Sequence, residues 1–146
     1  MTGRMGSDGQ DGQEGREPMI KTFVIALVGF PVLDGLWFGL LMKTFYREQL
    51  AGIARFQDGM LAPVWSAVAP VYVLLALGVA VFVIPRTVDI WSAARYGALY
   101  GLIVYGVFDL TNFSTLARYS PTLTFVDMCW GIVASAVCAA AVKALA

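Results

Sequence analysis

The sequence predicts an all-α protein: a four-helix transmembrane bundle with antiparallel neighbouring helices and a disordered N-terminal tail. Two observations indicate this fold class. Of the 146 residues, 59% are hydrophobic and only 14% are charged, whereas soluble domains average about 25% charged residues. The apolar residues also gather into four segments of ~20 residues, the length at which a helix crosses ~30 Å of hydrocarbon. The mean hydropathy of +0.73 agrees with both.

Residues 1–18 form the predicted tail. Glycine falls at every third position from Gly3 to Gly15, mostly among acidic and amide side chains. The run is short and contains no proline, so a collagen-like helix is not expected. Low hydrophobicity predicts disorder instead. The membrane domain is therefore expected to occupy residues 19–146.

The first predicted span covers residues 22–42. It is longer than the apolar part of a signal peptide and no convincing cleavage site follows it, so we expect a retained helix. Pro31 is predicted to kink this helix. A charged connection follows, and its amphipathic middle, residues 45–56, is predicted to lie along the membrane interface.

The other three spans are separated by short turns, which favour antiparallel neighbours. Pro63 suits the first turn of a helix, whereas Pro70 lies deeper and predicts a second kink. Lys143 marks the end of the last span. The predicted spans cover residues 60–84, 96–116 and 122–142.

Four spans place both termini on one side of the membrane. Five basic residues flank the spans on that side and four flank them on the other. Because basic residues accumulate in cytoplasmic connections, we predict that both termini are cytoplasmic.

Three aspartates lie inside the predicted spans: Asp34, Asp109 and Asp127. A charge in the middle of a membrane costs at least ~2.5–3.5 kcal/mol, so such groups face the bundle interior, pair or carry a proton. At ~1.5 Å per residue, all three fall between ~7 and ~12 Å below the membrane face opposite the termini. This common depth predicts one shared polar site.

Each aspartate has a polar or aromatic residue three positions later, on the same helix face. Trp65 falls at a similar depth in the second span. Ordinary roles also fit these residues, because tryptophans anchor helices at membrane interfaces and amides join helices. The predicted ligand-binding residues are Asp34, Trp37, Trp65, Asp109, Asn112, Asp127 and Trp130.

Small side chains predict how the helices pack. The pairs Gly35–Gly39 and Gly97–Gly101 have the four-residue spacing that lets two helix backbones approach closely. Cys129 and Cys138 are nine residues apart in one helix, ~13.5 Å along its axis, which is too far for a mutual disulfide. Both cysteines are expected to be small buried residues.

Several functional classes are disfavoured. The formal net charge is zero, so no nucleic-acid partner is expected. The chain has no histidine, the most common metal ligand, and its other residues have no metal-binding spacing, so no metal is expected. It also has no glycine-rich phosphate loop, and we expect no cofactor. The lipid bilayer is the expected partner.

The segments 105–116 and 127–131, containing Phe108-Asp109-Leu110-Thr111-Asn112 and Asp127-Met128-Cys129-Trp130-Gly131, resemble a family of small predicted bacterial membrane proteins of unknown function. Asp34 and Trp37 match an aspartate and a tryptophan in that family's first span. The resemblance extends from Met19 to the C-terminus. Where the family often has tyrosine before the aspartate, this chain has Phe108. The resemblance implies a four-helix protein of the bacterial inner membrane and supplies no substrate.

The sequence leaves four functions open. The first is binding or transport of a small amphipathic or cationic ligand, with the acids holding its polar part and the indoles its apolar part. The second is a lipid-modifying enzyme with paired aspartates as acid and base. The third is a proton- or cation-coupled carrier, which would need a homodimer because four spans are few. The fourth is an assembly or accessory subunit without a ligand.

Overall fold

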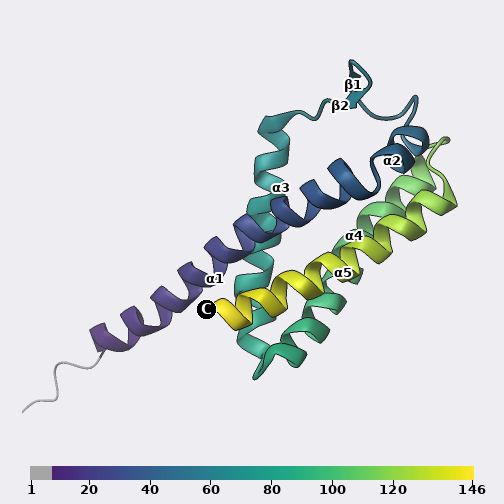
Figure 1. The fold of residues 1–146 in the computed structure, drawn as a ribbon. Helices are drawn as coiled ribbons and strands as arrows, with labels where there is room; N and C mark the ends of the chain where they lie inside the picture. Colours follow the sequence, from purple (N-terminus) through teal and green to yellow (C-terminus); the bar gives the residue numbers. More distant parts are fainter. Residues whose placement is uncertain (1–7) are drawn as a thin grey trace, which may run out of the picture.

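The computed structural model describes the backbone of residues 8–146 and the side chains of residue 16 and residues 18–146. Within them lie five α-helices: α1 (Asp8–Leu36), α2 (Lys43–Gln49), α3 (Trp65–Gly78), α4 (Ile90–Thr115) and α5 (Pro121–Leu145). The π-helical turns η1 (Trp37–Leu41) and η2 (Val79–Val83) extend α1 and α3, and the 3₁₀ turn η3 (Ile84–Arg86) follows η2. The strands β1 (Phe56–Gln57) and β2 (Met60–Leu61) pair as a small antiparallel hairpin between α2 and α3 (Figure 1).

The first helix begins earlier than the sequence predicts. The tail prediction covers residues 1–18, but α1 starts at Asp8, and residues 1–7 lie outside the described residues. Glycines at positions 9, 12 and 15 disfavour helix. Once the apolar segment has formed a helix, however, each further residue adds a hydrogen bond without a new nucleation cost.

Three helical segments of the described residues are long and apolar enough to cross a membrane: Pro18–Leu41, Trp65–Arg86 and Pro121–Leu145. They correspond to the first, second and fourth predicted spans. The third predicted span lies inside α4, which has 26 residues but carries more polar side chains and is not among the three. The count of four spans therefore stays a prediction.

The second span begins later than predicted. Residues 60–61 belong to β2, and α3 starts at Trp65, so Pro63 precedes the helix instead of occupying its first turn. The residue before a proline avoids the helical conformation, which favours this later start. In the preceding connection only α2 is helical, and Gly52 has a φ of +79°, a left-handed conformation that ends any continuous helix there.

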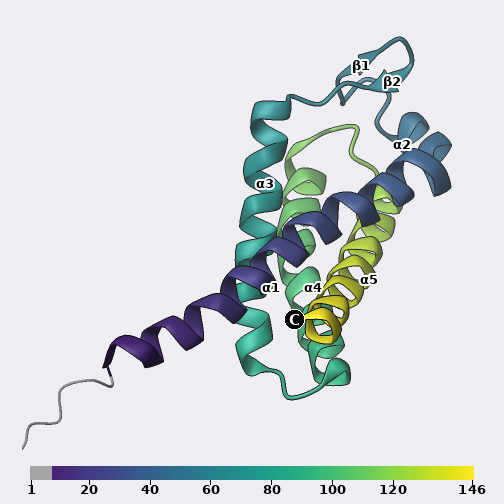
Figure 2. The same cartoon turned by 60° about the vertical axis from the view of Figure 1, so that its left-hand side comes forward.

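Helices α4 and α5 pack against each other along their length, and α1 crosses α3 and α5 (Figures 1 and 2). The Gly97–Gly101 pair lies in the α4–α5 contact: a methyl group added at Gly101 would meet the backbone of Gly131, and one at Gly97 would meet that of Ser135. The prediction of close packing is therefore confirmed for this pair. It is wrong for Gly35 and Gly39, which have nothing within 4 Å of an added methyl group.

The two ends of the helices differ. The C-terminus and the η3–α4 turn lie at one end, and α2, the hairpin and the α4–α5 link lie at the other (Figure 2). Asp89 begins α4 by accepting a hydrogen bond from the Ser92 backbone N–H, 2.6 Å away. Ser120 begins α5 in the same way by accepting from the Leu123 N–H. We call the end with α2 the α2 end.

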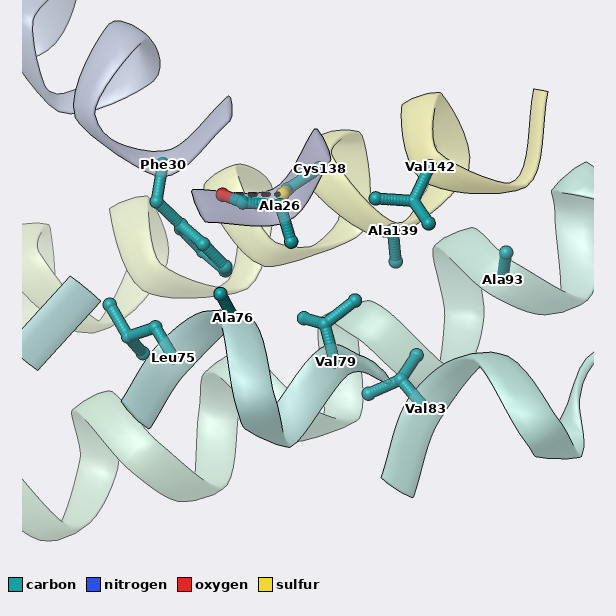
Figure 3. Packing of buried hydrophobic residues seen from close by; sticks show 10 residues of the cluster. All are labelled: Ala26, Phe30, Leu75, Ala76, Val79, Val83, Ala93, Cys138, Ala139 and Val142. Carbon is teal, nitrogen blue, oxygen red and sulfur yellow. Dashed lines mark hydrogen bonds between the residues drawn. The ribbon is translucent and has the colours of Figure 1, made fainter. Parts of the chain in front are cut away.

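Toward the opposite end, apolar side chains of α1, α3, η2, α4 and α5 meet in what we call the apolar core (Figure 3). Cys138 belongs to it, with its thiol 4.0 Å from the Ala26 carbonyl oxygen, as expected of a buried cysteine. Cys129 is exposed, so its predicted burial is wrong. The apolar core comprises Ala26, Phe30, Leu75, Ala76, Val79, Val83, Ala93, Cys138, Ala139 and Val142.

Candidate functional site

The three aspartates of the predicted site all turn away from the outer surface of the bundle. Asp109 is fully buried, and Asp127 and Asp34 are 7% and 9% exposed. They come from three different helices, α4, α5 and α1 respectively. The inward orientation that their common depth predicts is therefore observed. A role for them in binding a ligand stays a prediction.

Each aspartate accepts a hydrogen bond from a tyrosine hydroxyl. Tyr72 of α3 donates to Asp34 Oδ2 at 2.8 Å, and Tyr46 of α2 donates to Asp127 Oδ1 at 2.6 Å. Tyr119, in the link between α4 and α5, donates to Asp109 Oδ1 at 2.6 Å. We call these three acids and three tyrosines the acid–tyrosine cluster.

Sequence reasoning missed all three tyrosines. Tyr72 carries a signal that could have identified it, because a hydroxyl in an uncharged apolar span needs a polar partner. Tyr46 and Tyr119 lie in connections, where a tyrosine is more simply interpreted as an interfacial anchor. Only their burial, beside Leu123 at the α2 end, reveals that they point inward.

Each of the two tryptophans next to the acids donates a hydrogen bond to a group of another helix. Trp130 of α5 donates from Nε1 to Asp34 Oδ1 of α1 at 2.9 Å. Trp37, at the end of the α1 segment, donates to the Tyr46 hydroxyl at 3.1 Å, and Tyr46 in turn donates to Asp127 of α5. The indole rings stack in parallel with their centroids 4.5 Å apart. Each indole therefore supports the aspartate of the other helix.

Asp109 and Asp127 lie next to each other. Both carboxyl groups are buried, and Asp109 Oδ2 has no hydrogen-bond partner. Asn112, one turn after Asp109, is half-buried at the edge of the cluster, near Tyr119. Since two neighbouring ionised carboxylates repel each other, the arrangement suits a pair that holds one proton.

Trp65 does not belong to the site. Its side chain is 73% exposed at the start of α3, so its prediction as a ligand-binding residue finds no support. The depth estimate placed it near the acids because the second span was expected to begin five residues earlier. A tryptophan at the end of an apolar helix is typical of an interfacial anchor.

The cluster contains no basic side chain. Among the described residues, no lysine or arginine forms an ion pair with Asp34, Asp109 or Asp127. Burial, and then the nearby Asp127 carboxyl, raise the pKa of the Tyr46 phenol above its ordinary value. Burial and the hydrogen bond to Asp109 raise the pKa of Tyr119 in the same direction. Both hydroxyls therefore remain protonated donors at neutral pH.

A groove lies elsewhere on the surface. It has a volume of about 520 Å³ and runs between α1 and α5, where residues such as Val28, Leu33 and Val137 line it. None of its lining residues belongs to the acid–tyrosine cluster, and its lining is almost wholly apolar. The groove therefore does not reach the three acids. The described residues also contain no group of three potential metal-ligating side chains.

The long apolar helices and their exposed apolar outer surfaces fit an integral membrane protein. Residues 19–144 match the model of a family described as "Predicted membrane protein (DUF2177)". The chain belongs to this family, whose function is unknown, and the resemblance seen in the sequence is confirmed. No curated protein and no solved structure matches the chain.

Proposed function

We propose that this protein binds a small cationic ligand, such as the ammonium group of an amphipathic molecule, at the acid–tyrosine cluster. One observation carries the proposal: three carboxyl groups are buried in the bundle without a basic partner among the described residues. A buried ionised carboxylate is costly unless a countercharge or a proton compensates it. The protein would reside in the bacterial inner membrane with both termini in the cytoplasm.

Asp34 is the acid best arranged to meet a cation. Each of its two oxygens accepts one hydrogen bond, from Tyr72 and from Trp130. Two hydrogen-bond donors suit the ionised form of a carboxyl group. Each oxygen keeps a further lone pair for a ligand, and the stacked indoles beside it offer ring faces that attract cations.

The tyrosines define how a ligand would enter. Tyr46 lies in α2 and Tyr119 in the α4–α5 link, both at the α2 end (Figure 1), and their hydroxyls donate to Asp127 and Asp109. A ligand larger than a proton therefore needs α2 or the α4–α5 link to move. The arrangement corresponds to a closed site, which opens when these connections separate.

The experiment measures binding of dodecyltrimethylammonium to the purified full-length protein in lipid nanodiscs, by calorimetry and by quenching of tryptophan fluorescence. We expect Asp34→Asn to weaken binding at least about tenfold, which is about 1.4 kcal/mol. Asp58→Asn, in the exposed hairpin, is the matched control and should bind like the wild type. Equal affinity for wild type and Asp34→Asn, with unchanged melting temperature, would refute the proposal.

A lipid-modifying enzyme is the second candidate, because Asp109 and Asp127 are neighbouring buried carboxyl groups, as a general acid and base require. Mass spectrometry of lipids from cells that express the wild type or Asp109→Asn tests it. A lipid that changes in abundance only with the wild type would favour this candidate over binding alone.

A further inference from the structure

The buried carboxyl groups of Asp109 and Asp127 are neighbours in the cluster. Two ionised carboxylates offer only acceptors and repel each other, so a hydrogen bond between them can form only when one of them is protonated. Asp109 Oδ2 supplies the position for it, since this oxygen is fully buried and has no donor. The other Asp109 oxygen already accepts from Tyr119, and Asp127 Oδ1 accepts from Tyr46.

The groups around the pair come from every neighbouring element. Tyr46 faces it from α2, Tyr119 from the α4–α5 link and Asp34 from α1, while Tyr105 of α4 lies within electrostatic range of all three acids. Tyr72 of α3 faces Asp34. No lysine or arginine of the described residues pairs with either carboxyl group, so no fixed positive charge replaces the proton.

Tyr46 and Tyr119 differ in the groups that surround their hydroxyls. The Tyr46 oxygen accepts a hydrogen bond from the indole N–H of Trp37, a group that does not exchange its proton readily at neutral pH. Tyr119 lies in the link between α4 and α5, residues 116–120, near Asn112. It is 7% exposed, whereas Tyr46 is 2% exposed. Tyr119 is therefore the less buried of the two tyrosines and the one nearer to water.

We infer that Asp109 and Asp127 form a binding site for one exchangeable proton and that Tyr119 relays this proton to and from the α2 end. In the inward step, the Tyr119 hydroxyl gives its proton to Asp109 Oδ1, and its oxygen takes a proton from the water side. Rotation of the Asp109 carboxyl group then turns the protonated oxygen into the position that Oδ2 occupies, toward Asp127. One proton moves, and nothing is oxidised or reduced. The pair does not depend on whether the cluster also takes a cationic ligand.

Infrared difference spectroscopy of the full-length protein in nanodiscs tests the site. Between high and low pH, the wild type should gain a carbonyl band of a protonated carboxyl group, and this band should shift in heavy water. Asp109→Asn and Asp127→Asn should each remove it, whereas Asp58→Asn should not. If the wild type labelled with ¹³C-aspartate shows no shifted carboxyl band at any pH, the pair holds no exchangeable proton, whether or not the variants fold.

The relay is tested by the rate at which the band appears after a rapid pH change. Tyr119→Phe should slow it at least tenfold, and Tyr46→Phe, which also removes one tyrosine donor from the pair, should slow it less than twofold. Equal rates for the two variants, or a slower response for Tyr46→Phe, would overturn the assignment of Tyr119.

Discussion

The apolar core and the acid–tyrosine cluster are built by the same helices but depend on different forces. On α1, Phe30 belongs to the apolar core, and Asp34, one helical turn later, belongs to the cluster. Around Phe30 the contacts are between carbon atoms (Figure 3). Around Asp34 they are hydrogen bonds from Tyr72 and Trp130.

This difference matters in a membrane because lipid is as apolar as leucine. Apolar side chains therefore gain little by leaving lipid, and the core specifies the fold through shape and close approach. Polar groups find no hydrogen-bond partner in lipid, so the cluster specifies which helices must meet. Variants that disturb either the packing or the hydrogen bonds should therefore reveal the separate contributions of the two regions to stability.

The largest effect is expected at the closest backbone approach. Gly101→Leu would drive a side chain into the backbone of Gly131, which cannot rotate away, so overpacking should cost more than about 3 kcal/mol. We expect little monodisperse protein in size-exclusion chromatography. Gly35→Leu, at a glycine with open space, should elute and melt like the wild type. Normal elution of Gly101→Leu would mean that α4 and α5 do not touch there.

The next effect is expected in the apolar core. Phe30→Ala removes a fully buried ring, and the cavity should cost about 3 kcal/mol, the lower end of the usual range, because the transfer contribution is small in lipid. Thermal unfolding in detergent measures it. Val28→Ala, exposed two residues earlier on α1, is the control and should change stability by less than about 0.5 kcal/mol. Similar losses for both variants would contradict a packed core at Phe30.

A smaller effect is expected in the cluster. Tyr46→Phe removes the donor to Asp127 and the acceptor of the Trp37 N–H, and a hydrogen bond to a charged group contributes about 2 kcal/mol. Thermal unfolding should show this loss, and the fluorescence of Trp37 should change. Tyr96→Phe, at an exposed tyrosine of α4, should change neither. If Tyr46→Phe melts like the wild type, α2 is not held by the cluster.

The sequence predicts the two regions unequally well. Burial of Asp34, Asp109 and Asp127 follows from depth alone, because helical rise converts residue number into position and an acid in lipid must face inward. The tyrosines that donate to these acids cannot be predicted from depth, because Tyr46 and Tyr119 lie in connections whose path depends on tertiary packing. The hydrogen bonds of Trp37 and Trp130 to groups of other helices could not be predicted either, because residue spacing within one helix does not identify the partners on another helix.

The glycine pairs make the same point for the apolar region. Gly35–Gly39 and Gly97–Gly101 have identical spacing, yet only the second pair contacts another helix. The four-residue glycine spacing permits a close approach of two helices, but the approach occurs only where the neighbouring helix has a surface that fits. Gly131 and Ser135 on α5 provide that surface for α4. No equivalent neighbour lies beside Gly35.

The smallest effect is expected at the turn before α4, where the polar contacts are exposed to water. The hydrogen bond from the Ser92 backbone lowers the pKa of the Asp89 carboxyl below its ordinary value of 3.8. Stabilisation by the ionised cap is therefore present above about pH 4 and is lost as the pH falls through the lowered value. Asp89→Ala should lower the melting temperature by a few degrees at pH 7 and by less at pH 3. Asp89→Asn keeps a capping oxygen and should lose the pH dependence while nearly retaining the stability at pH 7. If Asp89→Ala lowered the melting temperature as much as Tyr46→Phe, the exposed hydrogen bond at Asp89 would be as strong as those of the buried cluster, which contradicts the comparison.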